Sequence, residues 1–270
     1  MWSNYFKKPE FRYIFKFHLI NSIVKKKHLI LALSVFLIFG LSNHVHSQSD
    51  KDIDQVAVDI LDKMSDVIGE IESCAFQLVK DEDFINDDGM VERRRTHTTS
   101  YFKGPDRFAI RSRGHKGNKG YWYNGETLTY YSFDENNYVV LPTPNTSMAT
   151  IDSLHVTFGM RFPAADLFYP SFTDDVIDAF DRVKFAGMKQ VDGKDYFHVV
   201  AENRQLIFQL WIGNDGFYMP QMYAYTIKGD QPRSVSATFK AWELGVELPN
   251  PMFEFTPPDG ARLISIMAQE

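Results

Sequence analysis

The sequence predicts a mainly β protein of the α+β class, built from an antiparallel sheet, one long N-terminal helix and a short helical insert. Three observations support this prediction. Apolar residues recur at helical spacing over residues 50–72, the spacing changes to two from residue 73 onward, and turn residues recur at short intervals through the rest of the chain. The pattern predicts one sheet, and no linker suggests a second domain.

The helix predicted over residues 50–72 has one apolar stripe. Its apolar residues recur every three or four positions and are Ile53, Val56, Ala57, Ile60, Met64, Val67, Ile68 and Ile71. The opposite side is charged, with Asp59, Asp62 and Asp66 among its members. A helix of this kind buries one face, so we expect it to pack on the sheet.

Strands and turns alternate from residue 73 to residue 133. Turns are predicted at Asp88-Gly89 and at residues 104–106, with strands at 91–103 and 107–113 between and after them. The clearest hairpin joins residues 121–123 to 126–133 through Asn124-Gly125, a pair that tolerates the positive φ angles of a type I′ turn.

The period-two pattern breaks between residues 146 and 180, where short helices are predicted. Strands return afterwards, at residues 182–185, 196–201, 206–212, 222–228, 235–242 and 263–267. The helical segment is therefore an insert between two groups of strands.

Residues 1–47 have the order of a secretory signal peptide. Lys25, Lys26 and Lys27 precede an apolar run over residues 29–41, and small side chains follow at Val45 and Ser47. A run of this length is short for a membrane span, which needs about 20 apolar residues. We therefore expect cleavage, export and a soluble periplasmic product.

Residues 48–270 are predicted to form a single domain. The leader holds seven of the 29 Lys and Arg and one of the 35 Asp and Glu, which leaves 22 basic and 34 acidic residues and a net charge of −12. Cys74 is the only cysteine of the chain, so no intramolecular disulfide forms. Burial alone must stabilise this fold.

Several local patterns, in order, resemble a family of predicted periplasmic proteins related to the bacterial outer-membrane lipoprotein carriers (LolA/LolB-like). They are WYNGETLTYY from Trp122, NYVVLP from Asn137, DSL from Asp152, Gly159 followed by PAADLF from Pro163, DGKDYFH from Asp192, and FTPPDGA from Phe255. These segments span most of residues 48–270.

The resemblance implies a strongly curved antiparallel sheet that forms an incomplete barrel. It also implies that the N-terminal helix and the short inserted helices close the concave side around an apolar cavity. The implied function is non-enzymatic binding or transport of a hydrophobic ligand, a lipid or an acylated molecule, including a role in lipoprotein trafficking. The carriers' functional arginine has no assignable counterpart here, so no catalytic residue is carried over.

Signals for enzymatic or metal chemistry are weak in this sequence. His97, His115, His155 and His198 lack the spacing of a zinc site, and no Gly-x-Ser-x-Gly elbow occurs. Cys74 alternates with Phe76 and Leu78, which favours a packed thiol over a nucleophile. The glycines between residues 114 and 120 favour a hairpin connection over a phosphate loop, and the aspartates of residues 81–88 favour a solvated turn over a calcium loop. We expect no metal, no cofactor and no nucleic-acid partner.

Positive charge gathers between residues 93 and 119, a segment that contains nine basic residues and one acidic residue. On a strand, Arg107, Arg111 and Arg113 share one face, and Phe108 and Ile110 share the other. The basic face is expected outside the core. We favour a solvated face neutralised by nearby carboxylates, and the alternative is a surface for anionic lipid head groups, a membrane surface or an acidic envelope protein.

Aromatic residues pose a similar choice between core and cavity. The candidates for an apolar cavity are Trp122, Tyr130, Phe158, Leu167, Phe168, Trp211 and Tyr223. A curved sheet that its helices do not fill leaves some of them lining a cavity, and the insert is where a gate is expected.

Three functional hypotheses follow. The preferred one is a periplasmic carrier of a hydrophobic ligand, the alternative is an envelope protein-interaction or stress-sensing module, and a hydrolase comes third. An apolar cavity favours the first, a fully packed core the second, and a cleft with a nucleophile, a histidine and a carboxylate the third.

Export generates the first testable prediction. The exported protein should begin near Gln48, because the small residues before it suit signal-peptide cleavage. N-terminal sequencing of the protein from the periplasmic fraction checks this. An intact N-terminus in a membrane-embedded protein would contradict it.

Overall fold

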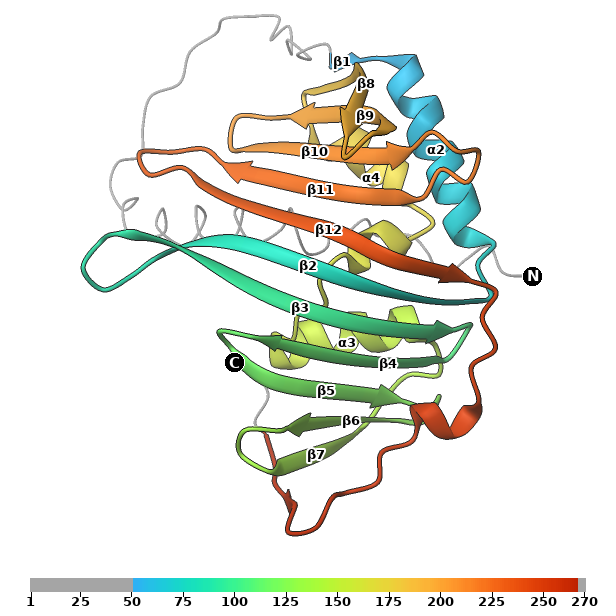
Figure 1. The fold of residues 1–270 in the computed structure, drawn as a ribbon, viewed down its shortest axis with the longest axis vertical. Coiled ribbons are helices and arrows are strands. Elements are labelled where there is room, and N and C mark those ends of the chain that lie inside the picture. The colour runs from blue at the N-terminus through green and yellow to red at the C-terminus, as the bar shows by residue number, and fades with distance from the viewer. Residues whose placement is uncertain (1–50, 267–270) are drawn as a thin grey trace, which may run out of the picture.

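The computed structural model describes residues 51–266, which form one open sheet with helices on one side (Figure 1). The strands are β1 (Asp52–Ile53), β2 (Ser73–Ile85), β3 (Val91–Lys103), β4 (Arg107–Gly114), β5 (Gly117–Tyr123), β6 (Thr127–Ser132), β7 (Asn137–Pro142), β8 (Arg182–Val191), β9 (Lys194–Glu202), β10 (Leu206–Gly213), β11 (Pro220–Ile227), β12 (Arg233–Leu244) and β13 (Arg262–Leu263). The helices are α2 (Gln55–Gly69), α3 (Ser147–Phe158) and α4 (Phe172–Ala179), with 3₁₀ turns η1 (Ala165–Phe168) and η2 (Asn250–Phe253).

The strand order is β1-β8-β9-β10-β11-β12-β2-β3-β4-β5-β6-β7-β13. Every pairing is antiparallel except the two at the edges, where the short strands β1 and β13 add in parallel to β8 and β7. The long hairpin of β2 and β3 lies in the middle and joins the two groups of strands that flank the helical insert. The predicted mainly antiparallel, incomplete barrel with helices on its concave side is confirmed.

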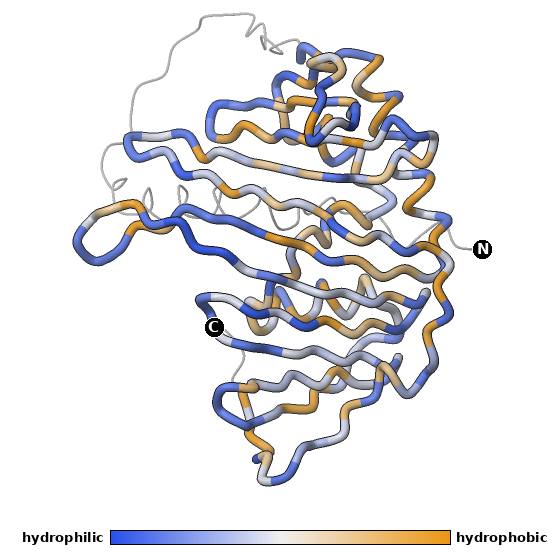
Figure 2. Tube along the Cα trace, viewed as in Figure 1, coloured by the Kyte–Doolittle hydropathy of each residue, from blue (hydrophilic) through white to orange (hydrophobic). Residues whose placement is uncertain are grey.

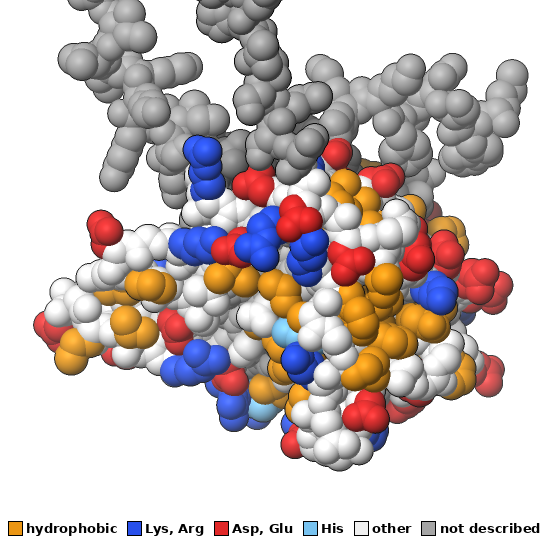
Figure 3. Space-filling model, turned by 90° about the horizontal axis from the view of Figure 1, so that it is seen from above, with side chains coloured by type: hydrophobic (Ala, Val, Ile, Leu, Met, Phe, Trp, Pro, Cys, Tyr) orange, Lys and Arg blue, Asp and Glu red, His pale blue; other side chains and the backbone are white. Residues whose placement is uncertain are grey.

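Helix α2 lies within the predicted segment 50–72 but is shorter, because Ile53 belongs to β1 and Ile71 follows the end of the helix. Asp54 caps its N-terminus: one carboxylate oxygen accepts a hydrogen bond from the Val56 N–H at 3.0 Å, and the other accepts from the Phe185 N–H of β8 at 3.2 Å. The cap thus fixes the helix start to the edge of the sheet. Its buried residues are Ala57, Ile60, Leu61, Met64 and Ile68. Asp59, Asp62 and Asp66 of α2 are exposed. Figure 3 shows acidic side chains gathered on the right of the view from above.

The helical insert also lies where the sequence predicts it. Thr146 caps α3 by accepting a hydrogen bond from the Ala149 N–H at 3.3 Å, and Gly159 ends the helix in the left-handed region, with φ of 64°. Helices α3 and α4 lie on the same side of the sheet as α2 (Figure 1). Helix α3 packs on β4 to β6 through Ile151 and Leu154, and α4 contacts α2.

Two apolar cores meet at a cluster of aromatic rings. The larger core joins α2, α4 and η1 to the strands from β8 to β12 and β2, and the smaller one joins α3 to β4, β5 and β6. Phe102 belongs to both, and its ring lies 5.5 Å from that of Phe168 and 5.8 Å from that of Phe108. This contact makes the two cores continuous.

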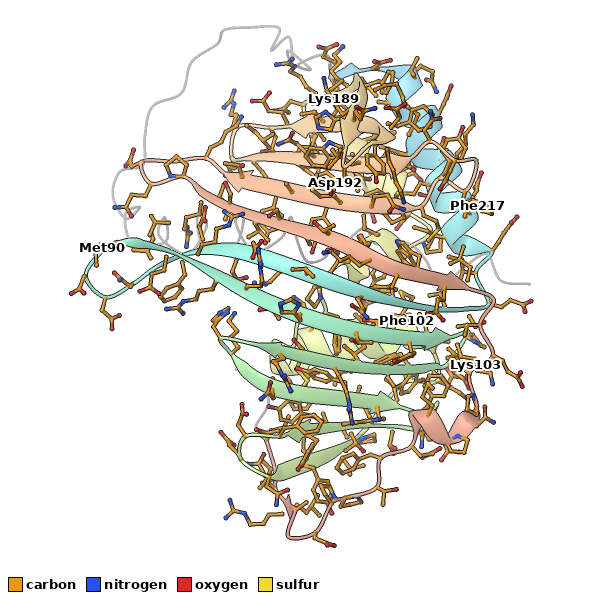
Figure 4. The ribbon with its side chains drawn as sticks, viewed as in Figure 1. Met90, Phe102, Lys103, Lys189, Asp192 and Phe217 are labelled. Carbon is orange, nitrogen blue, oxygen red and sulfur yellow. The ribbon has the colours of Figure 1, made fainter. Side chains whose placement is uncertain are left out.

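The C-terminal segment packs on the opposite, convex face of the sheet. Phe253 and Leu248 are buried against Ala109 of β4. Phe102 and Lys103 are consecutive on β3 (Figure 4) and point to opposite faces. The Lys103 ammonium donates hydrogen bonds to the Leu248 carbonyl and to Asn250 Oδ1, both at 3.0 Å, and holds this segment in place.

The structure corrects three details of the predicted elements. Asn124 does not adopt a positive φ, so the 124–125 turn is not type I′; instead its side chain accepts hydrogen bonds from the Glu126 and Thr127 N–H groups, and only Gly125 is left-handed, with φ of 101°. The strand predicted at 263–267 reduces to β13 within the described residues. Strand β7 was not predicted as a strand. The predicted leader lies outside the described residues.

Helix α2 generates a stability prediction. Ile60→Asp should lower the free energy of unfolding by more than about 3 kcal/mol, because it places a carboxylate in the apolar core. Val56→Asp on the same helix is the control, since Val56 is 51% exposed and Ile60 only 6%. Urea denaturation measures both variants. A wild-type midpoint for Ile60→Asp would show that α2 does not pack as described.

Candidate functional site

A pocket of about 840 Å³ lies on the concave face of the sheet. Its floor is formed by β2 to β6 and β11, and its other side by the segment 158–166, which follows α3. The lining residues are Lys80, Glu82, Thr96, Thr98, Ile110, Ser112, Gly114, His115, Lys116, Gly117, Lys119, Tyr121, Tyr130, Phe158, Gly159, Met160, Arg161, Phe162, Pro163, Ala164, Asp166, Tyr223, Tyr225 and Ile266.

The floor of the pocket changes from apolar to polar along the strands. One cross-strand row on the concave face runs through Phe76, Ser100, Ile110, Tyr121 and Tyr130. The row two residues further along the strands has polar side chains at three of its positions, and it contains Leu78, Thr98, Ser112 and Lys119. Figure 2 shows the same change, with hydrophilic residues at the left-hand ends of β3, β4 and β5.

Small residues leave the space that the pocket occupies. Thr98 and Ser112 face each other across β3 and β4, with their hydroxyl oxygens 3.4 Å apart. The next cross-strand pairs bring together Thr96, Gly114 and Gly117, two of which lack a side chain. A side chain at Gly114 would clash with the backbone and hydroxyl of Thr96. Glycine therefore permits the close approach of β3 and β4 here, and no side chain rises from the floor at this position.

The segment 158–166 covers the pocket through aromatic contacts. The Phe162 ring meets the Tyr121 ring edge-on at 5.1 Å and the Phe108 ring at 5.8 Å. Ala164 adopts a left-handed conformation, with φ of 67°, where the segment turns into η1. A small void of about 10 Å³ behind Phe162 and Pro163 extends toward Phe168. The pocket therefore points toward the aromatic junction between the two cores.

Four tyrosines on the floor remain neutral. Burial raises the pKa of Tyr121, Tyr130 and Tyr223 above its ordinary value, and burial together with the nearby Glu82 carboxylate raises the pKa of Tyr225 to about 12. The phenols thus present neutral rings and hydroxyl groups to the pocket at any physiological pH.

Charged side chains gather at the polar end of the pocket. Glu82 Oε2 accepts a short hydrogen bond from the Lys80 ammonium, and Glu82 Oε1 lies 3.3 Å from His115 Nε2. Burial opposes ionisation of Glu82, but the Lys80 hydrogen bond and the charges of Lys80, Lys116 and His115 lower its pKa overall. Burial lowers the pKa of His115, and the charge of Lys116 adds to this effect while Glu82 opposes it. Glu82 is therefore ionised and engaged at both oxygens.

Comparison with known proteins identifies the family. The family described as predicted periplasmic protein (DUF2092) matches residues 57–267. The chain belongs to the DUF2092 family. This membership confirms the expected family and the periplasmic location. No curated protein matches the sequence significantly.

Several solved structures align with most of this DUF2092 protein, at 10–14% identity and TM-scores below 0.5. An uncharacterized conserved protein from Thermus thermophilus has 10% identity and a TM-score of 0.46, over 78% of this chain and 99% of that chain. LprF from Mycobacterium bovis has 14% identity and a TM-score of 0.43, over 73% and 98%. A LolA superfamily protein from Nitrosomonas europaea has 11% identity and a TM-score of 0.31, over 74% and 97%. Among residues 51–266, no helix is long and apolar enough to span a membrane.

Three of the aromatic candidates line the pocket. Tyr130, Phe158 and Tyr223 come from β6, the end of α3 and β11, and the fold brings them to the same space. Leu167 and Phe168 instead lie in the core behind it: Leu167 is completely buried, and the Phe168 ring stacks on those of Phe76 and Phe102.

Trp122 and Trp211 lie on the convex face, away from the pocket. The Trp122 ring packs 4.9 Å from that of Phe255 in the C-terminal segment, and the Trp211 ring stacks on His198 at 4.4 Å. Alternation along the strand explains their position, because Tyr121 and Leu210, the residues before them, face the concave side. These two tryptophans should be removed from the set of cavity candidates.

The three arginines of β4 share the convex face. Arg107 lies 3.7 Å from the Asp106 carboxylate, and Arg113 donates a hydrogen bond to Asn118 Oδ1 at 3.1 Å. The Arg111 guanidinium lies over the rings of Phe133 and Trp122, at 5.2 and 5.9 Å from their centres. Arg93 and Arg95 of β3 pair with Asp83 and Asp81 of β2. Carboxylates therefore neutralise part of the basic segment, while Arg111 and Arg113 have no carboxylate within 4.0 Å among residues 51–266.

Most of the pocket floor is not predicted from the sequence. The missed residues include Thr98, Ser112, Tyr121, Lys119 and Tyr225. One signal was present in the sequence. Every second residue from Thr98 to Ser100 on β3, and Ser112 on β4, is small and polar, and these residues share a face with Phe102, Phe108 and Ile110. Small residues on a core-facing row indicate space that the protein does not fill.

Within residues 51–266, no group of three or more His, Cys, Asp or Glu side chains is arranged to hold a metal ion. Cys74 is 1% exposed, and burial raises its pKa to about 12. A thiol in that position is a packed core side chain.

Cys74 generates a reactivity prediction. The folded protein should not react with a thiol-specific disulfide reagent at pH 8, because its thiol is buried and protonated, whereas the protein in guanidinium chloride should react fully. In the unfolded chain the thiol ionises near pH 8.5, so its contribution to stability is complete below that pH and declines above it. Rapid labelling of the native protein would contradict the described burial.

Proposed function

We propose that this protein is a non-enzymatic periplasmic binding or carrier protein for a hydrophobic ligand, a lipid or an acylated molecule. The main support for a hydrophobic ligand is the 840 Å³ pocket on the concave face. Its lining residues include Ile110, Tyr121, Phe162 and Tyr223. Ligand pockets of small molecules are of this size and are lined mainly by apolar and aromatic side chains.

The proposed mechanism is reversible enclosure of an apolar chain. The ligand lies between the strand floor and the segment 158–166, with its chain directed toward Phe162 and the small void behind it. Removing the chain from water drives binding, with about 0.8 kcal/mol for each buried CH₂ group. The neutral tyrosine hydroxyls orient polar groups along the chain.

The segment 158–166 is the proposed gate. Phe162 holds it to the floor through ring contacts, and Gly159 and Ala164, on either side of Phe162, both adopt left-handed conformations. Apolar contacts of this kind are individually weak and are replaced by equivalent contacts when a ligand enters. The proposed gate, residues 158–166, is a shorter part of the insert than the whole segment 146–180 in which the sequence predicts a gate.

The basic convex face remains a candidate for contact with an anionic membrane surface or an acidic envelope protein. Of the three β4 arginines there, Arg111 and Arg113 are exposed. Delivery of an acylated molecule to a membrane or to another envelope protein, as in lipoprotein trafficking, requires such a contact. Salt would weaken it.

An envelope protein-interaction or stress-sensing module is the second candidate function. The tip of the β2–β3 hairpin supports it, because Met90 and Val91 there are 59% and 57% exposed and Phe84 is 37% exposed. Figure 4 shows Met90 at the end of this hairpin, which projects beyond the neighbouring strands. Exposed apolar side chains on a projecting element are typical of partner contacts.

A variant that fills the pocket tests the carrier proposal. Ser112→Phe should weaken uptake of a dansyl-labelled undecanoic acid at least tenfold, because the ring occupies the middle of the floor, and it should leave the unfolding midpoint nearly unchanged. Arg113→Phe is the matched control, since it adds the same ring to the next residue of β4 on the convex face. Fluorescence titration and urea denaturation measure both.

Equal affinity for the probe in Ser112→Phe and Arg113→Phe would place binding outside the pocket. Absence of uptake by the wild-type protein would contradict the carrier proposal and favour the interaction module.

A further inference from the structure

The charge of the pocket differs from that of the protein around it. Residues 48–270 contain 34 acidic and 22 basic residues. Four basic side chains nevertheless line the pocket, Lys80, Lys116, Lys119 and Arg161, against the two carboxylates of Glu82 and Asp166. A positively charged cavity in an acidic protein concentrates anions at that site.

The carboxylates of the pocket are engaged within the protein. Glu82 bonds to Lys80 and contacts His115, as described above. Asp166 is only 8% exposed and interacts with other groups of the protein. Both carboxylates therefore interact with groups of the protein, and Lys116 acts on Glu82 through its charge without forming an ion pair within 4.0 Å.

Lys116 and Lys119 supply two of the positive charges of the pocket. Both line the pocket, Lys116 from the β4–β5 turn and Lys119 from β5. Among residues 51–266, no carboxylate lies within 4.0 Å of either ammonium group. Each ammonium offers three donors to an oxygen anion, and the phenols of the floor stay neutral and add no competing negative charge.

The polar end and the apolar end lie along one line of the sheet. On β5, Lys119 and Tyr121 are two residues apart on the concave face, about 7 Å along the strand. Beyond Tyr121, the same face continues to Tyr123 and the aromatic core. One molecule can therefore contact the lysines with a head group and the tyrosine and Phe162 with a chain.

We propose that the pocket selects amphiphiles with an anionic head group, with Lys116 and Lys119 binding the head and the apolar end of the pocket binding the chain. This rests on the proposed carrier function and names its class of ligand. The shared chemistry is an anionic oxygen, a carboxylate or a phosphate, attached to an acyl chain.

Two single-chain lipids with the same acyl chain test the proposal. The anionic probe is lysophosphatidylglycerol and the neutral probe is monoacylglycerol, both measured below their micelle concentrations by competition with the dansyl probe. The wild-type protein should bind the anionic lipid at least tenfold more tightly, and rising salt should reduce this preference. Glycerol phosphate, which lacks the chain, should compete at least a hundredfold more weakly.

Charge reversal locates the head group. Lys116→Glu with Lys119→Glu should weaken binding of the anionic lipid at least tenfold and change binding of the neutral lipid less than twofold. Lys189→Glu is the matched control, because Lys189 is exposed on β8 and lies far from the pocket (Figure 4). Lys119→Arg should retain the preference. Circular dichroism verifies folding, and the salt dependence of the wild-type protein tests the same claim without a substitution.

Each outcome separates this inference from the carrier proposal. Equal binding of both lipids by the wild-type protein would overturn the inference and leave the carrier function intact. Tight binding of glycerol phosphate would overturn it in favour of a free phosphate site. Failure of both lipids to bind would overturn the carrier function as well.

Discussion

The structure depends on covering one face of a sheet that is wider than its helices. Neighbouring strands lie about 4.8 Å apart, so the longer strands together span roughly 50 Å. A helix of 12 residues, such as α3, is about 18 Å long. Helices α2, α3 and α4 therefore cover separate parts of the concave face, and aromatic rings fill the junction between them. Phe76 is central there, with the rings of Phe102, Phe168, Phe239 and Trp242 between 4.5 and 6.1 Å away.

The pocket follows from the same constraint. Where large aromatic side chains lie on the floor, as at Phe102 and Phe108, they fill the space between the sheet and the helices. Where Thr98, Ser112 and Gly114 replace them, the segment 158–166 does not fill the space above these small residues, and about 840 Å³ remains. The cavity thus results from side-chain volume along β3 and β4, and Lys80 and Lys119 on the neighbouring strands β2 and β5 contribute charge to its polar end.

Much of the fold follows from local patterns in the sequence. The apolar stripe around Ile60 identifies α2, and the period-two segments identify most of the strands, because each pattern reflects burial of one face of one element. The pocket depends on which face is covered by which distant segment. Trp122 and Tyr121 have the same local signal, but Phe255, more than a hundred residues away, packs on Trp122 and leaves Tyr121 for the pocket. Alternation along the strand puts the two side chains on opposite faces of the sheet, but it does not reveal which face is concave.

Mass spectrometry tests the central claim most directly. The protein should be purified without detergent from the periplasm of the bacterium that makes it, then weighed under native and denaturing conditions. Our account predicts a native mass that exceeds the polypeptide by one amphiphile, with the extra mass released on denaturation and carrying an acyl chain. A native mass equal to that of the bare polypeptide, together with a solved structure in which side chains fill the space between Ser112 and Phe162, would contradict it.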